Sequence, residues 1–156
     1  MATIDELSNE LLGIVKTTKA FKKNSYEIFN IEDLNDSEDF SGKKFPLAAI
    51  GYVGTFPMDR DGANRKASTV KSAAFRFMVV IAVEYESVGK QDKARKQATD
   101  LLDELRSKVL GYKGITNRPW DWLYEGPVND MDDDNAMYYA QSWEMVQTAI
   151  NVTQTN

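Results

Sequence analysis

The sequence predicts an α+β fold: a central, mainly antiparallel β-sheet flanked by two α-helices, in the order α-β-β-β-α-β-β, with a long β-hairpin loop. The segment Phe75–Tyr85 is apolar on both of its alternating faces through its middle, which is typical of a central strand covered on both sides. The helix that follows it is predicted from apolar residues that recur at helical spacing between Ala94 and Val109.

The first helix is predicted from a capping box at the start of the chain, where Thr3 is the N-cap and Glu6 follows three residues later. Behind this box, apolar residues recur every three or four positions as far as Val15, so the helix should span about Thr3–Thr18. We expect this helix to cover one face of the sheet and the second helix to cover the other.

Two strands are predicted next. Tyr26–Ile31 has strand-like composition and is followed by the acidic stretch Glu32–Asp39, which is typical of a solvated loop. Leu47–Val53 forms the second strand, and Gly54 and Pro57 should close it, because both residue types interrupt regular strands.

The segment Asp59–Lys71 lacks apolar periodicity and is rich in small and polar residues, so it is predicted as a long mobile loop between adjacent antiparallel strands. It carries four cations, Arg60, Arg65, Lys66 and Lys71. A solvated hairpin tip is one interpretation of this loop. The other is a projecting arm that docks on an acidic partner surface or a phosphate backbone.

The last third of the chain is predicted to contain the second helix and a hairpin. Gly111 stands at the C-cap position of that helix. The strands Trp120–Glu125 and Ala136–Ala149 then flank an acidic turn. By its length the whole chain, 1–156, is one domain, with the mobile loop at about 59–71 and the C-terminal hairpin at about 119–149.

Composition excludes several classes of function. The chain has no histidine and no cysteine, which removes the commonest general base, thiolate nucleophiles and disulfides. Its net charge of −5 gives no overall basic field to attract nucleic acid. There is no apolar run of about 18 residues and no signal sequence, so we expect synthesis in the cytoplasm and no membrane contact. We therefore predict that the protein is not an enzyme and needs no cofactor.

Three constellations of side chains were weighed as sites. Asp130–Asn135 imitates half of a calcium loop, but Asn135 replaces the required glycine and Gln141 the bidentate glutamate, so we interpret it as a solvated turn. Asp121 and Glu125, four residues apart on one strand face, would lie roughly 13 Å apart, too far for a hydrolytic pair. The hairpin aromatics are predicted to be core or subunit contacts, because no lysine or arginine interleaves them: Trp120, Trp122, Tyr124, Tyr138, Tyr139 and Trp143.

The length of the predicted strands points to assembly. The central and last strands, of about 11 to 13 residues, exceed the usual five or six. They would span roughly 36 to 43 Å, which is more than a domain of this size needs. Overhanging strands present free edges, and free edges are templates for pairing with another chain.

From the second helix onward, the sequence resembles the tail terminator proteins of long-tailed bacteriophages. The resemblance lies in a helix followed by Leu-Gly-aromatic, a strand that ends near aromatic-x-Gly, and an aromatic last strand. Here the matching segments are Leu101–Arg106, Leu110–Lys113, Pro119–Gly126 and Tyr138–Glu144. These aromatic and glycine spacings include no catalytic signature.

The resemblance implies a homo-oligomeric, hexameric ring in the tail or neck of a virion, assembled in the host cytoplasm. Such a ring caps the tail tube protein, ends tube polymerisation and offers a surface to a neck or head-completion protein. Genomic DNA would pass through its lumen without specific binding. No active residues, metal or cofactor are implied.

The subunit and tube contacts were assigned by charge. The hypothesis places the cations Arg60, Arg65, Lys66 and Lys71 against acidic residues of a neighbour, for which Asp132, Asp133 and Asp134 are the candidates. Two alternatives stay open: another neck, head-closure or tail-completion protein, and a small protein-binding module that acts on a host factor through the aromatic hairpin.

Overall fold

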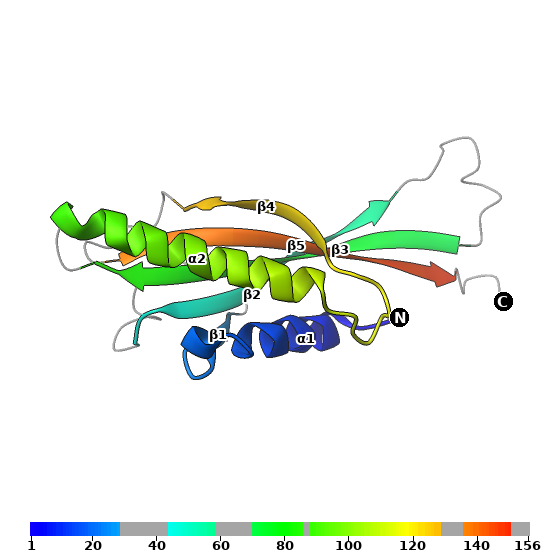
Figure 1. Ribbon diagram of the computed structural model, residues 1–156. Helices are drawn as coiled ribbons and strands as arrows, with labels where there is room; N and C mark the ends of the chain where they lie inside the picture. Colours follow the sequence, from blue (N-terminus) through cyan, green and yellow to red (C-terminus); the bar gives the residue numbers. More distant parts are fainter. Residues whose placement is uncertain (29–43, 59–69, 86–87, 129–135, 151–156) are drawn as a thin grey trace.

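A computed structural model describes residues 1–28, 44–58, 70–85, 88–128 and 136–150 (Figure 1). Its elements follow the predicted order α-β-β-β-α-β-β, with short 3₁₀ turns at Lys19–Phe21 and Val88–Lys90. The helices and strands are α1 (Ile4–Lys16), β1 (Ser25–Ile28), β2 (Leu47–Met58), β3 (Val70–Glu84), α2 (Gln91–Leu110), β4 (Asp121–Pro127) and β5 (Ala136–Ile150).

The strands form one five-stranded sheet in the order β1-β2-β3-β5-β4. β1 pairs with β2 in parallel, and all other neighbours are antiparallel. The predicted α+β class with a mainly antiparallel sheet is therefore confirmed. So is the central place of β3, whose neighbours on both sides run along most of its length.

Both helices form where local signals predict them. The Thr3 hydroxyl accepts a hydrogen bond from the Glu6 amide at 3.1 Å, and the Glu6 carboxylate accepts one from the Thr3 amide at 3.1 Å, which completes the capping box. The helix ends at Lys16, slightly earlier than predicted. In α2 every predicted stripe residue is buried and Gly111 is the C-cap: Ala94, Ala98, Leu101, Leu102, Leu105 and Val109.

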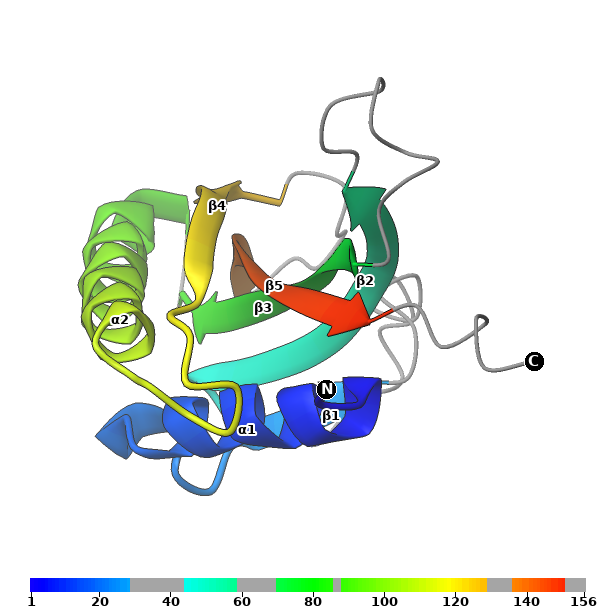
Figure 2. The same ribbon diagram turned by 90° about the vertical axis from the view of Figure 1, so that its right-hand side faces the viewer.

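The expectation that the helices cover opposite faces is wrong. α1 and α2 lie side by side on one face of the sheet (Figure 2) and share one core with the odd-numbered residues of β3. That face carries large side chains, such as Phe75 and Phe77, whose burial needs a thick apolar layer. The even-numbered face has small residues at Ala74 and Ala82 and takes part in a smaller apolar cluster around Val80.

The second and third strands are longer than predicted. β2 continues through Gly54 and Pro57 to Met58, with a register shift between Tyr52 and Gly54 that marks a β-bulge. The Ala48 amide points away from β3, because it donates to the Asn24 carbonyl at 2.9 Å. Backbone amides alternate in direction along a strand, and once the bulge is counted the nitrogen of Pro57 also points away from β3. Proline is tolerated there because no hydrogen bond to β3 is lost.

The connection between α2 and β4 is held against α1 by Glu10. Its carboxylate accepts hydrogen bonds from the buried Trp120 indole at 3.1 Å and from the Ile115 amide at 2.9 Å. A Cβ atom added at Gly114 would clash with this carboxylate. The close approach explains why glycine stands at this position.

Glu10→Ala should lower the free energy of unfolding by about 1 to 3 kcal/mol, because it leaves the buried Trp120 Nε1 donor without its partner. Urea unfolding followed by tryptophan fluorescence measures the change. Glu10→Gln retains an acceptor oxygen and should cost less. Equal losses in the two variants would contradict a hydrogen-bonding role for the carboxylate.

Candidate interaction surface

Three strands extend beyond the rest of the sheet and form an arm. In the described residues β1 pairs with β2 as far as Gly51, where the described part of β1 stops at Ile28, and the pairing of β4 with β5 ends at Glu144. Beyond these points β3 lies between β2 and β5 with no further described strand on either side, and the ends of β3 and β5 project past both helices (Figure 1). We define the arm as residues 54–58 of β2, 70–76 of β3 and 144–150 of β5.

An aromatic row crosses the sheet at the base of the arm. Tyr52, Phe77, Trp143 and Trp122 are successive register partners on four strands, all on the helix-covered face. The ring centroids of Tyr52 and Phe77 lie 5.5 Å apart, and Trp120 meets Phe77 edge-on at 5.7 Å. Both outer strands of the row bulge immediately beside it. Bulges bend strands and disturb the ladder locally, so both outer strands change direction at the base of the arm.

The open face of the arm is held by one ion pair. Arg76 Nε lies 2.6 Å from Glu144 Oε2 across β3 and β5, and the Arg76 guanidinium lies 4.4 Å above the Phe56 ring of β2. These contacts tie the three strands of the arm together. The Arg76 side chain is 43% exposed, so the pair adds modestly to stability. Its structural effect is to fix the direction of the arm.

The other face of the arm is tied to the start of the chain. Gln147 Oε1 accepts a hydrogen bond from the Ala2 amide at 2.7 Å, and Gln147 Nε2 donates to the Ala2 carbonyl at 3.0 Å. This reciprocal pair places the N-terminal end of α1 against β5. The arm is therefore braced on both faces and is not an isolated ribbon.

A buried polar network joins α2 to the last two strands. Arg106 of α2 makes two hydrogen bonds to the Glu125 carboxylate, at 3.2 and 2.7 Å. Gln141, which is fully buried, donates to the same carboxylate at 2.7 Å and to the Leu102 carbonyl at 3.1 Å, and it accepts from the Trp143 indole at 2.9 Å. The network fixes the position of β4 relative to α2 and β5.

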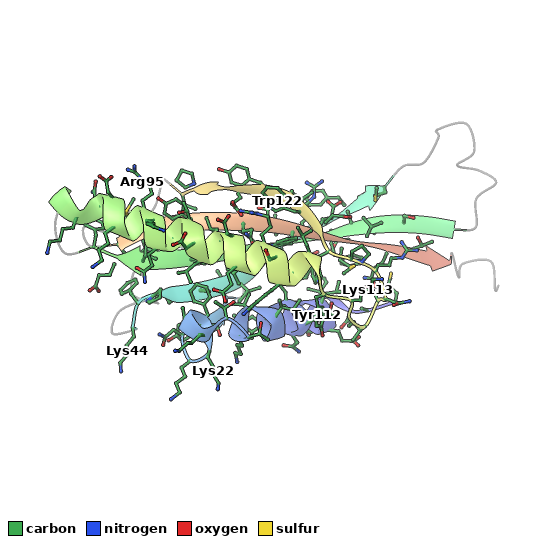
Figure 3. All side chains as sticks on the ribbon, viewed as in Figure 1. Lys22, Lys44, Arg95, Tyr112, Lys113 and Trp122 are labelled. Atoms are coloured by element: carbon green, nitrogen blue, oxygen red, sulfur yellow. The ribbon has the colours of Figure 1, made fainter. Side chains whose placement is uncertain are left out.

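The Arg106 guanidinium is stabilised in its charged form. Its hydrogen bonds to Glu125 and then to Asp103 raise the pKa of Arg106 above the ordinary value. It also lies 4.9 Å over the ring of Trp122, which Figure 3 labels on β4 beside α2. This contact leaves Trp122 46% exposed and holds it at the edge of the sheet.

The residues predicted as contacts lie largely outside the described part of the chain. Arg60, Arg65 and Lys66 belong to residues 59–69, and the candidates Asp132, Asp133 and Asp134 to residues 129–135, neither of which the structure describes. Lys71 lies in β3 opposite Ala149, which corrects its assignment to the loop, and its side chain is outside the described set. The contact hypothesis therefore stays a prediction.

The sequence spacing predicted that Asp121 and Glu125 share one face of a strand, and this is wrong. Asp121 is the register partner of Glu144 and Glu125 the partner of Gln141, because a bulge between Trp122 and Tyr124 shifts the alternation. The two carboxylates therefore point to opposite faces, and Glu125 is bound to Arg106. This geometry does not allow Asp121 and Glu125 to act together as a hydrolytic pair.

The hairpin aromatics divide into two groups. Trp120, Tyr138, Tyr139 and Trp143 are buried, which confirms the prediction that they pack in the core. Trp122 and Tyr124 are about half exposed on β4, at 46% and 51%. Base stacking would need basic residues along this hairpin, and β4 offers two carboxylates instead.

Sequence reasoning missed the Arg106 network and the Arg76–Glu144 pair, because each joins residues far apart in the chain. One signal was present: Gln141 is polar at a position of β5 where the alternating neighbours Tyr139 and Trp143 are large and apolar. A polar residue at such a position requires buried partners. The second strand was predicted to end at Val53, so its uncharged continuation to Met58 was also missed.

Within the described segments, no group of three or more Asp or Glu residues could hold a metal ion. In the same segments, no helix combines the length and the apolar composition that a membrane crossing requires. No protein-family model and no curated protein sequence matches the chain.

Proposed function

We propose that this protein is a structural component of a bacteriophage virion, a tail terminator whose hexameric ring caps the tail tube, ends its polymerisation and offers the surface for head joining. The observation that carries the proposal is the arm, which is a braced three-stranded extension with two uncharged edges on a helix-covered body. Such an extension suits a protein that acts by joining copies and partners.

The residues that resemble tail terminators fall in the scaffold behind the arm. Leu101 and Leu102 are core residues of α2, and the Trp120, Tyr139 and Trp143 rings fill the space between the sheet and the helices. They are packing residues, so they support a shared scaffold. The proposed terminator role is supported by how the scaffold presents the arm.

A ring of this kind would work by surface complementarity. One side of the ring matches the end of the tube, and the other side does not repeat the tube surface, so that growth stops when the ring binds. The same exposed side is then available to a neck protein. Binding by complementary surfaces needs no acid or base with a shifted pKa.

Removal of the gene from its parent phage tests the role by electron microscopy of the particles that assemble. We expect overlong tails separated from full heads. Tails of normal length beside unjoined heads would favour another neck or head-closure protein over a terminator. Normal infectious particles would overturn every virion role and favour a module that binds a host protein through Trp122 and Tyr124.

Expression of the intact gene from a plasmid provides the control, because it should restore tails of normal length. A plasmid copy that carries Glu10→Gln supplies a second control, since that change alters a contact remote from the arm edges.

A further inference from the structure

We infer that neighbouring copies join by sheet extension, with the β2 edge of one arm pairing with the β5 edge of the next. This inference rests on the proposed ring and names the contact that closes it. The edges are residues 52–58 of β2 and 145–150 of β5, which no described strand covers on the side away from β3.

Both edges lack the usual protection against pairing by charge. None of residues 52–58 and none of residues 145–150 is charged, in a chain with 28% charged residues. Exposed edge strands normally carry charges, are very short, or are covered. The other described edges fit that rule, since β1 carries Glu27 and β4 carries Asp121 and Glu125. The β5 edge has none of these protections, whereas the β2 edge carries Pro57, whose nitrogen faces away from β3, and a bulge beside Tyr52.

Strand direction determines the kind of contact. β2 and β5 are both antiparallel to β3, so they run parallel to each other. A second copy placed beside the first without being turned over brings its β2 next to β5 in parallel register. This contact joins two different edges, and such a contact closes a ring when the rotation from copy to copy divides a full turn. A two-fold axis would instead bring like edges together.

The side chains of the two edges suit each other. Phe56 and Met58 lie on the open face of β2, 41% and 45% exposed, in the same cross-strand rows as Val146 and Thr148 of β5. Pairing of two copies brings these rows together at the junction and removes apolar surface from water. Pro57 has no amide hydrogen to donate across the outer edge of β2. Because backbone amides alternate in direction, the nearest amide that points outward on this edge is that of Thr55.

Cysteine cross-linking tests this contact cleanly, because the chain has no cysteine of its own. Met58 and Thr148 lie in one cross-strand row of the same copy, so the two cysteines are placed in separate chains to prevent linking within a copy. Met58→Cys chains are mixed with Thr148→Cys chains and treated with a short bis-maleimide, whose reach tolerates a small shift in register, and we expect covalent dimers on denaturing gels. A mixture of Lys19→Cys and Thr99→Cys chains, with cysteines on exposed helical or turn positions away from the arm, measures chance linking.

Each outcome decides the inference. Dimers from the mixture, with none from Met58→Cys or Thr148→Cys alone, support pairing of unlike edges. Dimers from either single variant would show like edges in contact and overturn it. Hexamers in sedimentation with linking no greater than in the control pair would overturn the edge contact and leave the ring intact. Monomers in sedimentation without linking would also overturn it, while the tail phenotype decides the terminator role separately.

Discussion

Trp143→Ala is expected to lower the free energy of unfolding by about 3 to 5 kcal/mol, the loss typical of truncating a large buried aromatic residue. Trp143 is fully buried at the centre of the aromatic row, where β5 meets β3 and β4. Truncation leaves a cavity between the sheet and the helices. It also removes the indole N–H that donates a hydrogen bond to the Gln141 amide oxygen at 2.9 Å.

Urea unfolding followed by circular dichroism measures this loss without relying on the deleted fluorophore. Trp143→Phe is the matched variant, because it keeps an aromatic ring but deletes the indole N–H, and it should cost less than alanine. It also gives a readable value if the alanine variant does not fold. A loss below about 1 kcal/mol for alanine would contradict the packing of Trp143 at the core.

The helices and the order of elements along the chain could be predicted because their signals are local. The capping box at Thr3 needs only four residues of sequence, and the α2 stripe needs one regular spacing. The apolar middle of β3 likewise requires cover on both faces wherever its neighbours come from. Such signals depend little on tertiary context, and the structure confirms each of them.

The side of the sheet on which each helix lies could not be predicted in the same way. Burial of both faces of β3 seemed to require one helix for each. Side-chain size decides the matter instead: Phe75 and Phe77 need the depth of two helices, whereas Ala82 and Val80 need only a thin cover. The relevant signal is volume on alternate residues, which hydrophobic patterning alone does not record.

The overhang of the central and last strands was predicted, but the second and third strands were predicted too short. Gly54 and Pro57 usually end strands, but here one lies at a bulge and the other faces away from β3. Whether a proline nitrogen faces a partner depends on ladder register, which the sequence does not state. The Arg106 and Glu125 contact depends on register in the same way, since a bulge in β4 turns Glu125 toward α2.

Gln141→Ala is expected to cost about 3 to 5 kcal/mol, because it combines a cavity with the loss of buried hydrogen bonds. Gln141 is fully buried and contacts three groups: the Glu125 carboxylate, the Leu102 carbonyl and the Trp143 indole. Its removal leaves the indole donor without a partner inside the core. Because the same amide joins α2 to β4, we also expect faster hydrogen exchange of the β4 amides, measured by mass spectrometry.

Gln141→Leu separates the two contributions, since leucine fills much of the same volume but forms no hydrogen bond. The difference between leucine and alanine reports the cavity, and the loss that leucine still causes reports the polar contacts. A double-mutant cycle of Gln141→Leu with Trp143→Phe then isolates their shared bond, with an expected coupling of about 0.5 to 3 kcal/mol. Strict additivity would contradict that bond, and a leucine variant as stable as the natural chain would mean that the network adds specificity without net stability.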